Sequence, residues 1–356
     1  MSGRDVRLYP LRLTVTVKPL VFGGHALARR LGKTGIPDWS VAETWECSDV
    51  AGLSGVVTEG PLAGRSLRQV VADHPQDLMG AGWSGRCFPV LTKFIDATGS
   101  LPVHLHADDE AARRLEGQRN GKTEAWHILD AAPGATALCG VREGVTPGRL
   151  RAALQAQDFD AVLRRLPVRA GETIYVPGGT PHSFGPDTLV YEIEQTSDIQ
   201  QHAMRWRMED GSPVSDAEFD ANLDMLMRQV HPESRPDFTP GLRIALGDGA
   251  ERVFLCASPY FALERWTSAG PLRRSFATAQ ILSTVGAPVR VRSGDWEGEL
   301  GRAQTLLLPA SCGEAEITGP ADVLFGCLPD LDRDVRAPLL EAGYSRRHIA
   351  ALGAGS

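Results

Sequence analysis

The stretch Gly171-Glu-Thr-Ile-Tyr-Val-Pro177-Gly-Gly179-Thr-Pro-His182 decides the fold of this chain. Its first half alternates as a β-strand does, and the Pro-Gly-Gly that follows predicts a tight turn. A histidine stands just beyond that turn, and imidazole is a common ligand of divalent transition metals. His182 therefore needs partners from elsewhere in the chain to complete a set of metal ligands.

Two further stretches supply such partners. Leu101-Pro-Val-His104-Leu-His106 places two histidines two residues apart, so on a β-strand both side chains leave the same face. Gly121-Lys122-Thr-Glu124 adds a carboxylate. A His-x-His pair alone is weak evidence, but the three stretches together predict one metal site. Its predicted ligands are His104, His106, Glu124 and His182.

Composition narrows the class of protein. The chain has 356 residues, a net charge of −7 and scattered basic residues, which predicts no affinity for nucleic acid or for an anionic membrane surface. The N-terminus lacks the apolar core of a signal peptide, and no apolar run approaches the roughly 20 residues that span a bilayer, so we expect a cytoplasmic location. Six dispersed cysteines argue against a disulfide framework. The expected oligomeric state is a monomer or a homodimer.

Many short strands at close spacing predict a mainly β fold, a double-stranded β-helix of the jelly-roll type. The same pattern of short strands and turns is found again after a linker near residue 232, which predicts a second domain. We expect a metal-binding domain over residues 1–231, a degenerate and metal-free copy over 232–328, and a C-terminal helix with a fraying tail over 329–356. Thr146-Pro147 opens a predicted helical hairpin, inserted at about 146–166.

The motifs resemble those of a known family. The stretch 171–182 matches the second cupin motif without a gap, and His104-x-His106 matches the start of the first. The glutamate comes late, inside Gly-Lys-Thr-Glu-Ala-Trp126, which is typical of a narrower group. With further anchors at 42–46, 88–97 and 192–198, the chain resembles the type I phosphomannose isomerases (mannose-6-phosphate isomerases) in their short bacterial form, from about residue 8 to 328.

This resemblance implies a fold of two cupin domains and one bound divalent metal, zinc first, with another transition metal possible. The family uses a glutamine where this chain has His104, a substitution that is expected to preserve metal binding. The implied reaction interconverts mannose-6-phosphate and fructose-6-phosphate through an enediol. Lys122 is the implied catalytic lysine, and a neighbouring cation would disfavour its ammonium form, which helps it act as a base.

Two departures from the family pattern bear on the substrate. Pro102 replaces a serine, and His202 stands where the family has an essential arginine. Histidine holds a phosphate less well than a bidentate guanidinium, and Arg205, three residues on, would face the other side of a strand. His202 is a candidate catalytic acid or base, or a sign that the activity is lost. The open alternatives are an isomerase or epimerase of another, possibly unphosphorylated sugar, and a non-catalytic sugar-binding relative.

The positions of several other side chains can also be predicted from the sequence. Lys93 either points into the site or lies along a strand edge. His127, three residues from Glu124, should face away from the metal and be structural. Trp45 and Trp126 are expected in the core, with a smaller chance that one lines a sugar pocket. The remaining histidines have no supporting context and are expected at the surface: His25, His74, His231 and His348.

Overall fold

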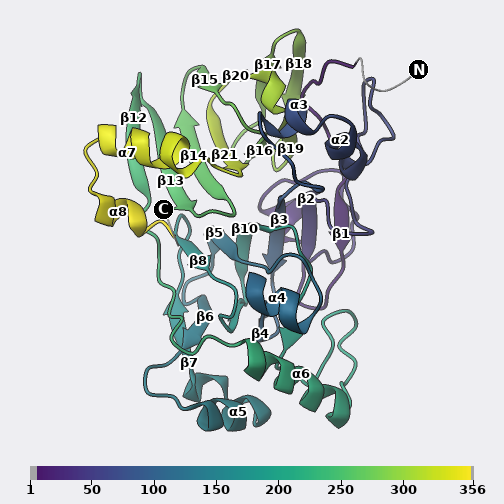
Figure 1. Cartoon of the computed structure of the whole chain (residues 1–356), viewed down its shortest axis with the longest axis vertical. Coiled ribbons are helices and arrows are strands. Elements are labelled where there is room, and N and C mark those ends of the chain that lie inside the picture. The colour runs from purple at the N-terminus through teal and green to yellow at the C-terminus, as the bar shows by residue number, and fades with distance from the viewer. Residues whose placement is uncertain (1–5, 354–356) are drawn as a thin grey trace.

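The computed structural model describes residues 6–353, which form two β-sandwiches (Figure 1). The first sandwich has a six-stranded and a five-stranded sheet. The six-stranded sheet has the order β1 (Thr16–Lys18), β2 (Glu43–Cys47), β3 (Val90–Ala97), β10 (Thr188–Gln195), β5 (Glu124–Ala131), β8 (Thr173–Val176). The five-stranded sheet has the order β11 (Gln201–His202), β4 (His104–Leu105), β9 (His182–Phe184), β6 (Thr136–Val141), β7 (Leu163–Pro167).

The second sandwich repeats this topology. Its six-stranded sheet has the order β12 (Leu242–Gly247), β13 (Ala250–Ala257), β14 (Ala262–Ser268), β21 (Ala321–Cys327), β16 (Gln280–Thr284), β19 (Thr305–Leu308). Its second sheet has the order β15 (Leu272–Ser275), β20 (Glu314–Thr318), β17 (Val289–Ser293), β18 (Trp296–Leu300). Each six-stranded sheet places its strands in the same relative chain order, so the predicted mainly β fold of two cupin-like units is confirmed. The boundaries 1–231, 232–328 and 329–356 stay our proposed division.

The two sandwiches pack back to back through their six-stranded sheets. Phe94, Tyr191 and Ile193 share one buried apolar cluster with residues of β13, β14, β16 and β21, and the Tyr191 hydroxyl lies 3.0 Å from that of Ser283. Alternation along β3 and β10 sends the neighbouring side chains, Lys93 among them, into the first sandwich. One sheet thus carries an interface on one face and polar interior residues on the other.

The helices are short and lie outside the sheets. They are α1 (Ala26–Arg29), α2 (Leu67–Asp73), α3 (Pro75–Met79), α4 (Asp109–Leu115), α5 (Pro147–Gln155), α6 (Asp216–Gln229), α7 (Ala337–Glu341) and α8 (Arg346–Ala350), with single turns η1 (Phe159–Ala161), η2 (Ala310–Cys312) and η3 (Leu331–Arg336). α5 begins at Pro147 with Thr146 as its cap, as predicted. α5 and α6 bury their apolar sides against the five-stranded sheet (Figure 1).

The predicted hairpin at 146–166 is wrong in its second half. After α5 the chain makes the turn η1 and then pairs as β7 with β6. The helix that packs beside α5 is α6, far along the chain, with Ser215 capping the backbone N–H of Glu218. The spacing of Phe159, Val162 and Leu163 suits a helix, but the backbone hydrogen bonds offered by β6 favour a strand there.

The expected fraying tail is also wrong for the part of it that the structure describes. η3 is a turn of π-helix that leads into α7 and then α8. Ile349 and Leu352 are buried in a cluster with Phe254 and Leu339, and the Leu352 carbonyl accepts a hydrogen bond from the backbone N–H of Ala257. Within residues 6–353, none of the helices combines the length and apolarity that a membrane crossing requires.

Candidate metal centre

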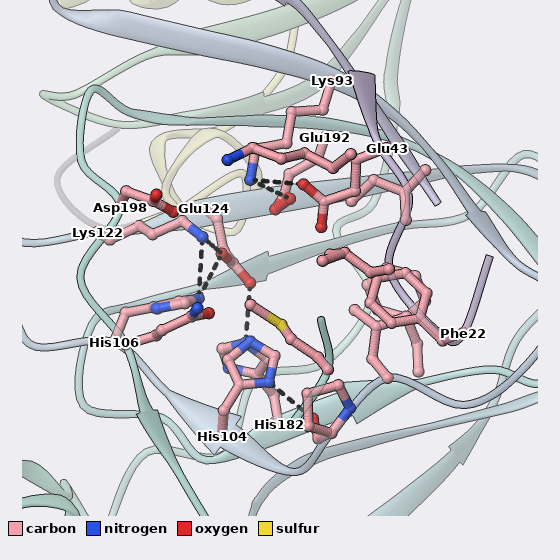
Figure 2. Close-up of a pocket in the computed structure, with 18 of the residues that line it drawn as sticks. Phe22, Glu43, Lys93, His104, His106, Lys122, Glu124, His182, Glu192 and Asp198 are labelled. Atoms are coloured by element: carbon pink, nitrogen blue, oxygen red, sulfur yellow. Dashed lines mark hydrogen bonds and ion pairs between the residues drawn. The ribbon is translucent and has the colours of Figure 1, made fainter. Parts of the chain in front are cut away.

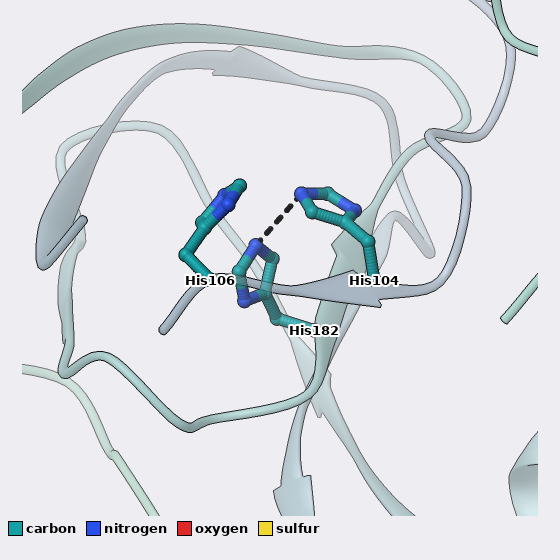
Figure 3. Close-up of side chains that lie close together, drawn as sticks. All are labelled: His104, His106 and His182. Carbon is teal, nitrogen blue, oxygen red and sulfur yellow. Dashed lines mark hydrogen bonds between the residues drawn. The ribbon is translucent and has the colours of Figure 1, made fainter. Parts of the chain in front are cut away.

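The four predicted ligands meet inside the first sandwich (Figure 2), and Figure 3 shows the three histidines among them. His104 and His182 are directly paired across β4 and β9, with their Nε2 atoms 2.9 Å apart. Glu124 reaches them from β5 in the opposite sheet: its Oε1 lies 3.2 Å from Nε2 of His182 and its Oε2 3.2 Å from Nε2 of His106. All four side chains are buried.

Each histidine is oriented by a backbone carbonyl. The Nδ1 atoms of His104, His106 and His182 lie 2.7, 2.6 and 2.9 Å from the carbonyl oxygens of Pro102, Ile199 and Thr180. An Nδ1–H that donates to a carbonyl leaves the Nε2 lone pair free, and this is the usual support of metal-bound histidines. These backbone contacts thus present three Nε2 lone pairs to one point.

The electrostatics of the cluster suit a cation. Burial lowers the pKa of all three imidazoles, well below the usual range for His104 and His106, so they are neutral, which is the form that binds metal. Oε2 of Glu124 is buried without a hydrogen-bond donor. Donor atoms about 3 Å apart match ligands that surround one ion at about 2.0–2.2 Å. The residues present therefore fit a divalent metal, and their role as its ligands stays a prediction.

Lys122 lies beside the cluster. Its Nζ is 3.2 Å from Nε2 of His106, 3.2 Å from Oε2 of Glu194 and 3.6 Å from Oε2 of Glu124. Burial is the largest single effect and lowers the pKa of Lys122, but Glu194, Glu124 and Glu192 together outweigh it, so the net pKa is raised. The carboxylates thus favour the ammonium form, against the effect that we expect from a bound cation.

The cluster forms one end of a cavity of about 290 Å³. Trp126, Phe184, Phe22, Leu20 and Leu101 provide apolar wall, and Lys93 lies at the polar side. Of the two explanations for Lys93, the structure supports the one that points it into the site (Figure 2). Trp45 and Trp126 are buried as expected, and both also line the cavity.

Several further carboxylates that line this cavity or lie beside it had no predicted role. Lys93 Nζ lies 3.2 Å from Glu194, 3.6 Å from Glu192 and 3.7 Å from Glu43, and Asp198 lines the same cavity (Figure 2). Glu192 pairs directly with Lys93 across β10 and β3, and Glu194 pairs with Glu124 across β10 and β5. The Glu192-x-Glu194 spacing predicts that the two side chains lie on the same face of a strand. It does not predict which residues of the neighbouring strands they contact.

His202 pairs with His104 across β11 and β4, with ring centroids 5.7 Å apart. It packs beside the predicted ligand and is not one of the side chains that line the cavity. Burial lowers the pKa of His202, an effect that Glu209 opposes. Arg205 faces away, as expected, and forms an ion pair with Asp216.

The other histidines lie outside the cluster. His127 is buried on the opposite face of β5, as expected, with Nδ1 2.9 Å from the Thr173 hydroxyl. His25 is partly buried, and His348 is exposed on α8 as expected. The expected surface position is wrong for His74, which is buried. His231 is partly exposed, and its Nε2 lies 2.8 Å from Asp108, next to the turn that precedes His182.

Comparison with known proteins identifies relatives of similar sequence and similar fold. The chain is 30% identical over 322 residues to a probable mannose-6-phosphate isomerase of Bacillus subtilis, covering 89% of this chain and 98% of the relative. It is 28% identical over 317 residues to a mannose-6-phosphate isomerase of Streptococcus mutans, covering 88% and 97%. The crystal structure of mannose 6-phosphate isomerase from Bacillus subtilis superposes with a TM-score of 0.80 at 25% identity, over 90% of this chain and 99% of that one. No protein-family model matches.

The fold and the site define a protein with two cupin domains and a cluster of three histidines and one glutamate inside the first. The relatives narrow this class, because the match at 30% identity spans nearly the whole of the relative. The chain belongs to the mannose-6-phosphate isomerase family.

Proposed function

We propose that this protein is a metal-dependent aldose–ketose isomerase that interconverts mannose-6-phosphate and fructose-6-phosphate. The observation that carries this proposal is the convergence of His104, His106, Glu124 and His182 beside a buried lysine, in a chain of this family. Named relatives of nearly equal length support the same reaction.

The proposed ligands of the metal are His104, His106, Glu124 and His182, with zinc as the first metal to test. When bound there, a divalent ion supplies a Lewis acid that stabilises negative charge on the sugar oxygens at C1 and C2. The three carbonyl-oriented imidazoles and the buried carboxylate are preorganised for that ion, so little rearrangement is needed.

Lys122 is the proposed proton carrier. Its Nζ lies within 3.6 Å of both His106 and Glu124, so a sugar whose reacting carbons lie at the cluster would also contact the ammonium. In the forward reaction a proton leaves C2 of the aldose and one is added at C1, and a proton also moves between the two oxygens. Glu194 and Lys93 hold Lys122 in a buried polar network, which fixes Nζ and excludes bulk water.

His202 is the weaker catalytic candidate. Because it packs against His104 from outside the cavity, we propose that it positions this ligand rather than touching the sugar. A change at His202 should therefore alter metal affinity more than the pH dependence of turnover.

One observation favours a second candidate, an isomerase or epimerase of an unphosphorylated sugar. Five carboxylates line the cavity, against three lysines. Like charges oppose binding of a phosphate dianion. The five are Glu43, Glu124, Glu192, Asp198 and Glu209.

A paired substrate panel tests both candidates. The metal-free protein is reconstituted with zinc or manganese and offered mannose-6-phosphate and free mannose, and product is followed by NMR. The proposal expects fructose-6-phosphate, dependent on metal and lost in Lys122→Met. Turnover of free sugar alone would select the second candidate. Binding without turnover across the panel would mean a non-catalytic relative.

A further inference from the structure

Lysine is rare in this protein. The chain has 37 basic residues, and four of these are lysines: Lys18, Lys33, Lys93 and Lys122. Every other basic residue is an arginine. Three of the four lysines line the cavity of the candidate metal centre. The fourth, Lys33, is buried against Glu46, with its Nζ 2.8 Å from the carboxylate. Lysine is therefore concentrated at this cavity.

Two of the three cavity lysines are already neutralised. Lys122 contacts Glu194 and Glu124, and Lys93 contacts Glu194, Glu192 and Glu43. Both are almost fully buried. Neither ammonium carries a net positive charge that a phosphate group could use.

Lys18 differs from both. Within residues 6–353 it forms no ion pair, and it is partly exposed on β1. Its Nζ lies 4.4 Å from the centre of the Trp45 ring, whose other lysine neighbour is Lys93 at 4.8 Å. Glu43, directly opposite Lys18 across β1 and β2, accepts from the Trp45 indole instead. The ring supports the ammonium without neutralising it.

The cavity also lacks the residue type that usually holds a phosphate. Among the residues that the structure describes, no arginine lines it. Arg205 is engaged with Asp216, and His202, which does not line the cavity, packs beside His104. A phosphorylated sugar with its reacting carbons at the histidines would thus have one uncommitted cation within the cavity wall.

We propose that Lys18 binds the phosphate group of the phosphorylated hexose and sets the preference for phosphorylated over free sugar. This inference rests on the proposed isomerase function and adds to it the residue that contacts the phosphate. Lys18 acts on substrate binding and takes no part in the proton transfer.

The test uses glucitol 6-phosphate, which has no carbonyl and cannot turn over, with glucitol as the unphosphorylated partner. Binding to the metal-loaded full chain is measured by calorimetry for the wild type, Lys18→Met, Lys18→Arg and Arg149→Gln. Lys18→Met keeps the apolar stem over Trp45 and removes the charge. Arg149 is exposed on α5, so its variant makes the same change of net charge outside the cavity.

Loss of a charge-assisted hydrogen bond predicts that Lys18→Met binds glucitol 6-phosphate about ten- to a hundredfold more weakly. Glucitol binding should be unchanged, Lys18→Arg should retain most of the affinity, and Arg149→Gln should behave as the wild type. In turnover, Lys18→Met should raise KM for mannose-6-phosphate with kcat nearly constant. Equal phosphate affinity in Lys18→Met and the wild type would overturn the proposal, as would an equal loss for both ligands.

Failure of the proposed function gives a different result. A wild type that binds glucitol 6-phosphate through Lys18 but converts neither hexose phosphate would refute the isomerase and keep the binding role. A wild type that binds glucitol as tightly as its phosphate would refute the role of Lys18.

Discussion

The Nε2 atoms of His104 and His182 face each other 2.9 Å apart across two paired strands. Both Nδ1 atoms are held by backbone carbonyls, of Pro102 and Thr180, so neither ring is free to turn away. Two lone pairs held this close repel each other until a proton or a cation lies between them. The pair is therefore preorganised for an ion.

His104→Gln should weaken metal binding and not abolish it. The amide oxygen of glutamine is a poorer ligand for a transition metal than imidazole. We expect the dissociation constant for zinc to rise on the order of tenfold or more, measured by competition with a chromogenic chelator. His348→Gln, on the exposed surface of α8, is the matched control and should bind as the wild type. An unchanged affinity in His104→Gln would remove His104 from the ligand set.

Lys122→Met should lower kcat by roughly 10²–10⁴ while the protein keeps its metal, because loss of a positioned proton carrier costs about that much. The substitution also leaves Glu194 with less positive charge nearby. The double variant Lys122→Met with Glu194→Gln removes one positive and one negative charge, so it restores the balance of charge in this buried network. If the double variant folds normally and regains turnover, the lysine is structural and the catalytic role is wrong.

Stability should fall in acid because of His127. Burial and the neighbouring Arg265 lower the pKa of His127 to about 3. The unfolded chain takes up a proton below about pH 6.5, whereas the folded chain does so only near pH 3, so the stability present above pH 6.5 is lost as the pH falls between these values. At pH 5 this amounts to about 2 kcal/mol.

Denaturant unfolding at pH 7 and pH 5 measures this effect. His127→Gln has no such titration, so its loss of stability between the two pH values should be smaller than that of the wild type by about 2 kcal/mol. Equal losses in the two proteins would mean that His127 is protonated in the folded state.

Leu352→Ala should destabilise the protein by about 2–5 kcal/mol, since it opens a cavity in a fully buried site near the C-terminus. Arg347→Ala, exposed on α8, should change the free energy of unfolding by no more than about 0.5 kcal/mol. Thermal or urea unfolding distinguishes the two. A wild-type stability for Leu352→Ala would restore the expected fraying tail.

The sequence predicts those parts of the site whose residues follow one another along the chain. The turn before His182 and the alternation of His104 and His106 are local patterns, so both strand and ligand could be inferred from them. The carboxylates around Lys93 could not, because their positions depend on the register between β3, β10 and β5. Register is fixed by packing across strands, which a single sequence does not display.

The helical regions contain one helix that could have been predicted from the sequence and one strand that could not. Ser215 and Glu218 mark the start of α6, and Phe219, Leu223 and Leu226 give it an apolar side, so this helix could have been predicted. β7 could not have been distinguished from a helix by periodicity. Its identity comes from hydrogen bonds to β6, a strand more than twenty residues earlier.

The gathering of lysines in one cavity has a practical consequence for handling the protein. Side-chain amines are the groups that acylating reagents, amine-coupled sensor surfaces and lysine-specific proteases recognise. In this chain three of those four amines line the substrate cavity and the fourth is buried. Covalent attachment through lysine would therefore modify a residue of the cavity itself. Conversely, protection of Lys18 from a small acylating reagent would show that the cavity is occupied.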